Sequence, residues 1–276
     1  MNKEDVRTRF SSLATGPDTD IRLDEAALLI AAESDGDLDV DAYLAKLDNL
    51  ADKFETGARP ATSLGISVSS LIDFIHGEEG FSGNVRNYYD PENSYLNRVI
   101  DTRLGIPVTL ALIHIGIGQR LDLPVGGISF PGHFLVRYGK DKQLIVDPFT
   151  GRILSETDCA TLLRQLAGPR AKIKPEDFSL ASNKDILIRI LDNLKQIFWR
   201  KKSWDDSKAC IERQLLLQPE ITELSVQLGA VYEMQGDLIS ARTTYTTVLQ
   251  QCEDDELKNL ASKRLLALET KANIIH

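Results

Sequence analysis

Residues 107–121 leave almost no polar face on a helix. Their apolar side chains are distributed around the helix axis, at Val108, Leu110, Ala111, Leu112, Ile113, Ile115 and Ile117. A helix that is hydrophobic on every side has to be buried, and Pro107 suits the first turn of such a helix. The sequence therefore predicts a central helix from Pro107 to about Leu121, with the rest of the domain packed around it.

Two short runs rich in Phe, Val, Tyr and Ile follow this helix, at 133–138 and 143–147. Such residues favour strands, and the Gly-Lys-Asp sequence at 139–141 favours a tight turn between them. Directly opposite residues of a hairpin share one face, with Cβ atoms about 5 Å apart. A three-residue turn then places the imidazole of His133 beside the carboxylate of Asp147, the orienting half of a nucleophile–His–Asp triad. The same register pairs Val136 with Leu144 and Tyr138 with Lys142.

The composition is typical of a soluble globular protein and disfavours several classes of function. The chain has 276 residues and a net charge of −9, which makes nucleic acid and anionic membrane surfaces poor partners. It contains no uncharged apolar run of about 18 residues that would cross a membrane. Met1 to Phe10 does not resemble a signal peptide, so a cytoplasmic location is expected. The three cysteines are too far apart to form a CxxC pair, which argues against a zinc site or a disulfide framework.

Periodic apolar residues on both sides of the central helix predict further helices. Residues 1–20 are mostly polar and are expected to be a loose lead-in. Residues 168–183 contain two prolines, a glycine and several charges, so they are predicted to be a linker. This linker would separate an α+β domain at 1–167 from an all-helical domain at 184–276. The expected helices of the first domain span 24–34, 39–54, 67–76, 94–103 and 155–166.

The predicted helical domain contains a weak repeat with a period of 34 residues. Six residues of the second copy have the spacing of a tetratricopeptide unit, and Trp204 and Leu238 occupy the same position in the two copies. Residues 255–271 are expected to form a capping helix. Because grooves of such repeats commonly take peptide segments, we expect a protein or peptide partner to bind here. The six residues are Leu228, Gly229, Tyr232, Gly236, Asp237 and Ala241.

The histidines suggest neither a metal nor a cofactor. His114 lies within the apolar helix and is expected to be a packed, hydrogen-bonded side chain, while His76 and His276 are expected at the surface or at helix ends. Four scattered histidines without matched carboxylates do not form a metal-ligand pattern. For His133, a purely structural hydrogen bond is the alternative to a functional pair, because Asp147 precedes a proline and an Asp-Pro step is also a common turn.

The segment around the central helix resembles the transglutaminase-like core, which has the papain-type fold. In that family a Gly-x-Cys opens the central helix, a short turn ending in proline follows it, a His starts a strand and an Asp ends the next strand. Here Leu121-Asp122-Leu123-Pro124 matches the turn, His133-Phe134-Leu135-Val136 matches the His strand, and Val146-Asp147-Pro148 matches the Asp strand. The family's cysteine stands one helix length before the turn's proline, and that position holds Pro107 in this chain.

Four motifs resemble one branch more closely, the bacterial SirB-type family: NYYDPENSYLN, RLGIPVTL, FPGHFLVR and DPFTG. That family joins a degenerate transglutaminase-like domain to C-terminal tetratricopeptide repeats, and proline commonly replaces its cysteine. The resemblance covers roughly residues 20 to 250. It implies an α+β fold with a papain-type core and a small antiparallel sheet, followed by an all-α tetratricopeptide-like region.

The replacement of the cysteine bears directly on the expected chemistry. A cysteine at a helix N-terminus beside a histidine has a lowered pKa and is a good nucleophile, whereas proline has no nucleophilic atom. Thr109 is the nearest hydroxyl and has no predicted activator, and Cys159 lies on a different predicted helix. We therefore expect His133 and Asp147 to be the remnant of a triad in a non-catalytic interaction or regulatory protein. The alternative is a hydrolase or acyl transferase that uses an unidentified nucleophile.

Overall fold

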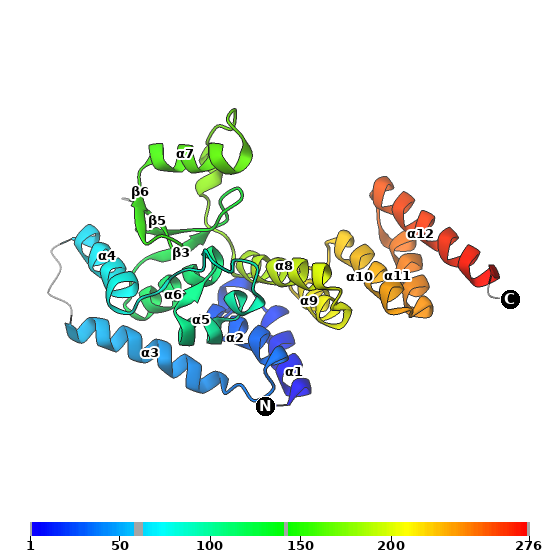
Figure 1. The fold of residues 1–276 in the computed structure, drawn as a ribbon, viewed down its shortest axis with the longest axis horizontal. Helices are drawn as coiled ribbons and strands as arrows, with labels where there is room; N and C mark the ends of the chain where they lie inside the picture. The colour runs from blue at the N-terminus through cyan, green and yellow to red at the C-terminus, as the bar shows by residue number, and fades with distance from the viewer. Residues whose placement is uncertain (1, 58–62, 141–142, 275–276) are drawn as a thin grey trace. The chain divides into compact units, whose positions relative to one another are not determined.

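The computed structural model describes residues 2–57, 63–140 and 143–274. The chain divides into two compact units, Met1–Ile190 and Leu191–His276, coloured from blue to green-yellow and from yellow to red in Figure 1. The boundary falls within helix α8 (Asn183–Lys201). The other helices of the first unit are α1 (Lys3–Ala14), η1 (Asp18–Asp20), α2 (Leu23–Ser34), α3 (Val40–Gly57), α4 (Leu64–Ile72), η2 (Asp73–Glu78), η3 (Pro91–Ser94), α5 (Leu96–Thr102), α6 (Pro107–Arg120), α7 (Glu156–Ala167) and η4 (Pro175–Phe178).

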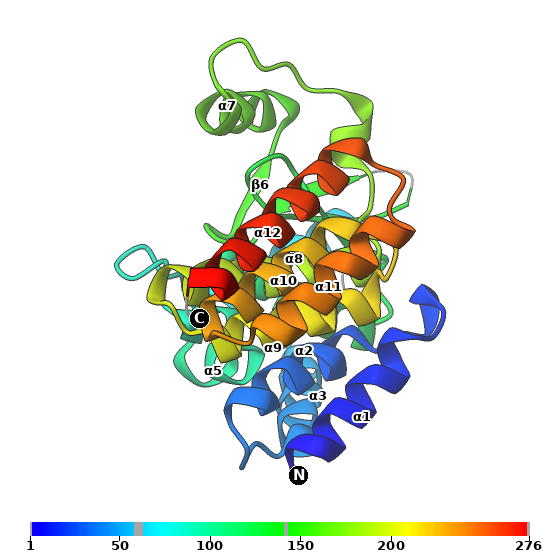
Figure 2. The ribbon, with the colours of Figure 1, turned by 90° about the vertical axis from the view of Figure 1, so that its right-hand side faces the viewer.

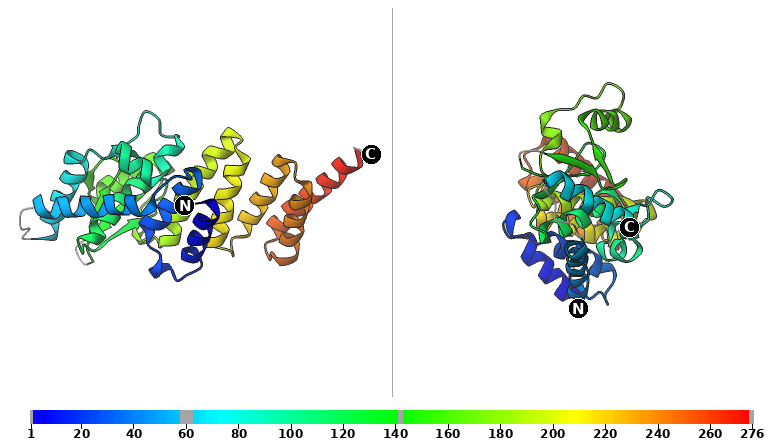
Figure 3. Two further views of the ribbon diagram at one scale, coloured as in Figure 1. Left: turned by 90° about the horizontal axis from the view of Figure 1, so that it is seen from below. Right: turned by 90° about the vertical axis from the view of Figure 1, so that its left-hand side faces the viewer.

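The centre of the first unit is α6, as the sequence predicts. Every residue from Pro107 to Gly118 is buried, and α2, α3 and α5 pack around it. Figure 3 shows α3 as a long helix on the outside of this unit. The expected helices at 24–34, 39–54 and 155–166 correspond to α2, α3 and α7 within two residues at nearly every end. An α+β fold with a buried central helix is therefore confirmed.

A small antiparallel sheet packs against α6. Within the described residues its strands have the order β3-β4-β5-β6. One face of the sheet contacts α6, and the other packs on α7 through a cluster of buried residues that includes Leu135, Cys159 and Leu163. The sheet thus lies between two helices (Figure 1). The strands are β3 (Val125–Ile128), β4 (Leu135–Tyr138), β5 (Leu144–Asp147) and β6 (Arg152–Leu154), and β1 (Ser82–Gly83) pairs separately with β2 (Leu104–Gly105).

The hairpin register differs from the predicted one by two residues. Val136 pairs with Val146, and Tyr138 pairs with Leu144, because the connection is longer than the predicted three-residue turn. Parts of that turn, at 141–142, lie outside the described residues. Side chains alternate between the two faces of a strand, so a shift of two residues moves no side chain to the other face.

The expectation of a loose lead-in at 1–20 is wrong. Residues 3–14 form α1, which packs against α2. Val6, Phe10 and Ala14 are each 1% exposed. Their spacing of four residues aligns them on one helix face, and this short apolar stripe is hidden in a sequence that is otherwise polar.

The segment predicted to be a linker, 168–183, falls within the first unit. Leu180 forms an isolated bridge with Ile128 of β3, and the Ala181 N–H donates to the Gly127 carbonyl at 2.9 Å. Farther along, the Asn183 and Lys184 N–H groups donate to the carboxylate of Asp18. The start of α8 is thereby held to the turn between α1 and α2.

The second unit is entirely helical in its described part. After α8 it contains α9 (Trp204–Leu217), α10 (Thr222–Gln235), α11 (Leu238–Gln251) and α12 (Asp255–Ile274), and successive helices from α9 onward pack together (Figure 2). The first residues of α9 and α11 are 34 positions apart in the sequence, and so are their last residues. The last residues of α8 and α10 are also 34 positions apart. A Cβ on Gly229 of α10 would lie 2.6 Å from the Tyr245 ring of α11, so the close approach of these two helices needs glycine at this position.

Candidate functional site around His133 and Asp147

The structure brings His133 and Asp147 together. Nε2 of His133 lies 2.9 Å from Oδ1 of Asp147. Asp147 is the last residue of β5, and His133 lies in a bend two residues before β4, so the pair spans the open end of the hairpin. Both side chains are largely buried, at 13% and 10% exposure.

Three donors hold the carboxylate of Asp147. Besides His133, the Phe149 N–H donates to Oδ1 at 3.0 Å and the Thr150 hydroxyl donates to Oδ2 at 2.7 Å. Burial by itself would raise the pKa of Asp147, but these hydrogen bonds and the nearby imidazole outweigh burial and lower the pKa below its ordinary value. The group is therefore an anion at neutral pH. In the neutral imidazole of His133, the carboxylate places the proton on Nε2 and leaves the lone pair on Nδ1.

A second chain of hydrogen bonds crosses the interior beside this pair. The His114 Nε2 lies 2.9 Å from the His76 Nε2, and the His114 Nδ1 lies 3.0 Å from the Tyr138 hydroxyl. His76 Nδ1 lies 2.8 Å from the Phe81 carbonyl. Since that carbonyl only accepts, one consistent set of protons is Tyr138 to His114, His114 to His76, and His76 to Phe81, with both imidazoles neutral.

Burial explains why both of these imidazoles are neutral. Desolvation lowers the pKa of His114 to about 3, helped by the neighbouring His76 and opposed by the charge of Asp147. The pKa of His76 is also lowered, again mainly by burial. With this set of protons, a proton added to His76 would go on Nε2 and face the Nε2–H of His114 at 2.9 Å, so the hydrogen bonds favour an uncharged His76.

The turn between β5 and β6 connects the His133–Asp147 pair with the His76–His114 pair. The Gly151 N–H donates to the Asp147 carbonyl at 2.9 Å, and Gly151 has a φ of +69°. A Cβ at Gly151 would lie 2.7 Å from the His76 ring. Residues 147–151 therefore pack directly on His76 while their first residue holds His133.

Two aromatic side chains extend from His133 toward the solvent. The Phe149 ring lies 6.4 Å from the His133 ring and 6.0 Å from the ring of Tyr88. Phe149 packs so closely on Gly83 that a Cβ there would lie 2.4 Å away. Tyr88 is 40% exposed, so the aromatic surface that begins at His133 continues to the solvent.

The residue at the start of α6 has no reactive group. Pro107 is the first residue of that helix and is buried. Thr109, in the same turn, uses its hydroxyl structurally: it donates to the Asn93 carbonyl at 2.7 Å and accepts from the Ile106 N–H at 3.1 Å. Cys159 is 1% exposed, and burial, together with the negative charge of Asp158, raises the pKa of its thiol to about 11.

The sequence predicts a contact between His133 and Asp147 and a packed, hydrogen-bonded His114, and the structure has both. The contact of His114 with His76 is not predicted. His76, expected at the surface or at a helix end, lies in the last turn of η2 and is only partly exposed. The sequence does contain one indication of such a contact: a histidine inside an apolar helix, such as His114, needs a polar partner. His276 lies outside the described residues. In the part of the chain that the structure describes, no group of three or more His, Cys, Asp or Glu side chains is arranged to hold a metal ion.

Residues 41–192, which include Pro107, His133 and Asp147, match the family described as the transglutaminase-like superfamily. The chain belongs to this family. A UPF0162 protein of Xylella fastidiosa is 35% identical over 249 residues, which cover 87% of this chain and 88% of the relative. Protein SirB1 of Salmonella typhimurium is 24% identical over 211 residues, or 76% and 78% of the two chains. No solved structure matches the chain.

These relatives confirm the SirB-type branch of the transglutaminase-like family that the sequence motifs indicate. The family match extends from α3 to the first half of α8, so it contains the whole of α6 and of the sheet. It also contains the His133–Asp147 pair and the His76–His114 pair. Among the described residues, the helices are all too short or too polar to cross a membrane.

Proposed function

We propose that this transglutaminase-like protein is not an enzyme, and that it acts in protein–protein interaction or regulation in the bacterial cytoplasm. The observation that carries the proposal is the side chain at the start of α6, where Pro107 stands in the position that the family resemblance gives to the nucleophilic cysteine. Acyl transfer through a covalent intermediate needs a thiolate or an activated hydroxyl within reach of the imidazole.

The other side chains considered as nucleophiles support the same proposal. The hydroxyl of Thr109 already bonds Asn93 and Ile106. The thiol of Cys159 is buried in the cluster between the sheet and α7, and its raised pKa keeps it protonated at neutral pH. A protonated, buried thiol is a poor nucleophile, so neither group replaces the missing cysteine.

The interaction role is proposed for the helical unit, read as tetratricopeptide-type repeats. It is supported by the 34-residue offset of α9 and α11 and by the close packing of Gly229 on Tyr245. Exposed apolar side chains are also present, with Met234 at 49% and Ile239 at 83% exposure. Such side chains are candidates for contact with a partner's peptide segment.

A second candidate, a hydrolase or acyl transferase, is favoured by one observation. The His133–Asp147 hydrogen bond has an ordinary length of 2.9 Å, and the neutral imidazole keeps Nδ1 for a proton transfer. This candidate requires a nucleophile supplied from elsewhere, for example by the substrate itself.

The interaction role is tested by affinity capture from cytoplasmic extract with the full chain. A double variant, Met234→Glu with Ile239→Glu, should lose the captured partner, while His133→Ala should retain it. Ile66→Glu is the matched control, because Ile66 is 52% exposed in the first unit. Loss of the partner with His133→Ala, but not with the double variant, would contradict the proposed role of the helical unit.

A further inference from the structure

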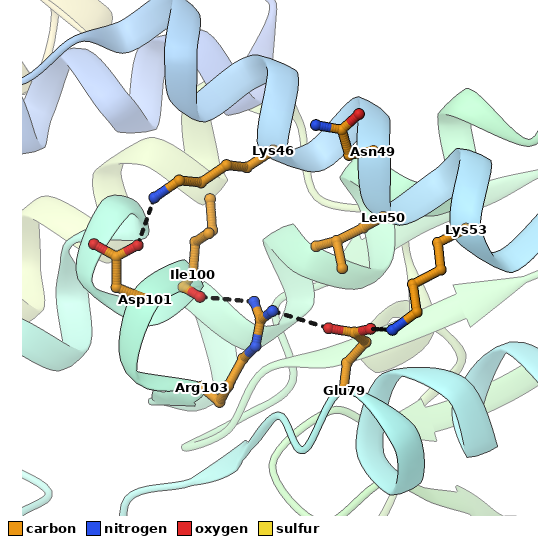
Figure 4. A pocket seen from close by; sticks show the side chains of 8 residues that line it. All are labelled: Lys46, Asn49, Leu50, Lys53, Glu79, Ile100, Asp101 and Arg103. Atoms are coloured by element: carbon orange, nitrogen blue, oxygen red, sulfur yellow. Dashed lines mark hydrogen bonds and ion pairs between the residues drawn. The ribbon is translucent and has the colours of Figure 1, made fainter.

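A pocket of about 400 Å³ lies on the first unit, between α3 and the end of α5. Figure 4 shows Lys46, Asn49 and Lys53 along one side of it, on α3. Arg103 lies across from them, and the carboxylate of Glu79 sits between the side chains of Arg103 and Lys53. Leu50 and Ile100, at 7% and 3% exposure, form an apolar floor.

Positive charge exceeds negative charge in this pocket. Glu79 accepts from both Lys53 and Arg103, the latter at 2.9 Å, and Asp101 pairs with Lys46 at 2.7 Å. Three cations thus face two carboxylates, in a chain whose net charge is −9. A local surplus of the opposite sign attracts ligands that the chain as a whole would repel.

Hydrogen-bond donors are also in surplus. Each lysine ammonium has three N–H groups and the guanidinium has five. The contacts with Glu79, Asp101 and the Ile100 carbonyl use fewer than half of them. The amide of Asn49, an exposed residue on the same face of α3, adds two more donors. What the pocket lacks is acceptors, which an anion would supply.

The backbone conformation and the contacts of Arg103 hold its guanidinium at the pocket. Arg103 has a φ of +63° at the C-terminal end of α5, a conformation that usually falls to glycine or asparagine. Its side chain stacks over the Phe81 ring at 4.5 Å and donates to the Ile100 carbonyl at 2.7 Å. These contacts fix the guanidinium at the pocket in spite of the cost of the left-handed backbone.

We propose that this pocket binds a small anionic molecule, whose carboxylate or phosphate oxygens accept hydrogen bonds from Lys46, Lys53 and Arg103. The apolar floor suits a compact ligand with a short hydrocarbon part. The pocket is separate in sequence from His133 and Asp147, and the proposal does not depend on the role assigned to that pair.

Titration calorimetry with the full chain tests this proposal, with inorganic phosphate and citrate as separate probes at constant low ionic strength. Saturable binding of phosphate alone would indicate a phosphate-bearing ligand, and saturable binding of citrate alone a carboxylate-bearing one. We expect at least one probe to saturate at millimolar concentration or below. Absence of saturable binding for both probes would overturn the proposal.

Variants that change the charge of the pocket test whether the anion binds there, because some should weaken its binding and one should strengthen it. Lys53→Met should weaken binding about tenfold, in line with the loss of one charged hydrogen bond. Asn49→Asp should weaken it several-fold by repulsion without removing an ion pair. Asp101→Asn should strengthen it several-fold, because it releases Lys46, and a folding defect would not do so. Lys172→Met, at an exposed position outside the pocket, should change nothing. Equal affinity in all four variants, or weaker binding with Asp101→Asn, would overturn the proposal.

Discussion

The carboxylate of Asp147 holds the His133 imidazole through a single 2.9 Å contact to Nε2, and the rest of its hydrogen-bonding capacity goes to its own turn. Phe149 and Thr150 bind the same carboxylate. Asp147 therefore orients the imidazole of His133 and also stabilises the turn at residues 147–151. The hydrogen bonds to Phe149 and Thr150 give Asp147 a structural role that does not depend on any chemistry at His133.

Asp147→Asn should destabilise the fold by about 1–3 kcal/mol at pH 7, since a buried, charged acceptor is replaced by a group that cannot serve all three donors. The folded-state pKa of Asp147 is lowered, so its contribution is present above the unfolded pKa near 3.8 and is lost as pH falls through the folded-state value. Urea unfolding at pH 7 and below pH 4 measures this difference. Asp37→Asn, at an exposed position, is the control. A gap between wild type and variant that does not shrink in acid would contradict the assignment.

Acid should weaken the fold through the His76–His114 pair. The folded-state pKa of His114 is lowered to about 3, so the unfolded chain binds a proton that the folded chain does not. Stability is then lost as pH falls from about 6.5 toward 3, at up to about 1.4 kcal/mol per pH unit for each such group. His114→Gln removes one titrating group and should flatten the dependence between pH 6.5 and 5. Equal slopes in the two proteins would show that His114 is not held neutral.

Gly151→Ala should destabilise the first unit by about 2 kcal/mol or more. The φ of +69° alone costs an alanine about 1 kcal/mol, and its Cβ would press on the His76 ring. Gly36→Ala is the matched control, because a Cβ there meets no atom within 4 Å, and we expect a change within about 0.5 kcal/mol. Denaturant midpoints of the two variants provide the measurement. Similar midpoints would mean that the turn does not pack on His76 as described.

Limited proteolysis with trypsin should cut first within 168–177. Arg170 and Lys172 are both exposed there, and the regular structure of this stretch is confined to the short η4. Cleavage needs a segment that opens locally at low cost. Mass mapping of the earliest fragments identifies the site. A dominant first cut at Arg120 or Arg137, in the core of the first unit, would refute the predicted order of stability.

Several of these features follow from local sequence alone. The central helix is predictable because apolar side chains on every face leave burial as the only stable outcome, and β4 and β5 are predictable from their residue types. The His133–Asp147 contact survives the error of two residues in register, since side-chain alternation has a period of two.

Other features depend on contacts that no local pattern encodes. The pairing of His76 with His114 joins residues 38 positions apart, and it requires η2 to lie across α6. Helix α1 has an apolar stripe of only three residues, and its burial is decided by α2. The pocket at Lys46, Lys53 and Arg103 likewise assembles charges from α3, from the residue that follows η2 and from the end of α5. Each of them is an ordinary surface charge in the sequence.

We predict that no thiol of this chain acts as a nucleophile, and the test is to react the native full chain with an iodoacetamide-type probe while amine incorporation and peptidase turnover are assayed. Peptide mapping then assigns the label among Cys159, Cys210 and Cys252. We predict slow labelling at all three, in keeping with their burial and with the raised pKa of Cys159 and Cys210, and no turnover above background. Rapid labelling of Cys159, together with turnover that both Cys159→Ala and His133→Ala abolish, would contradict the non-catalytic account.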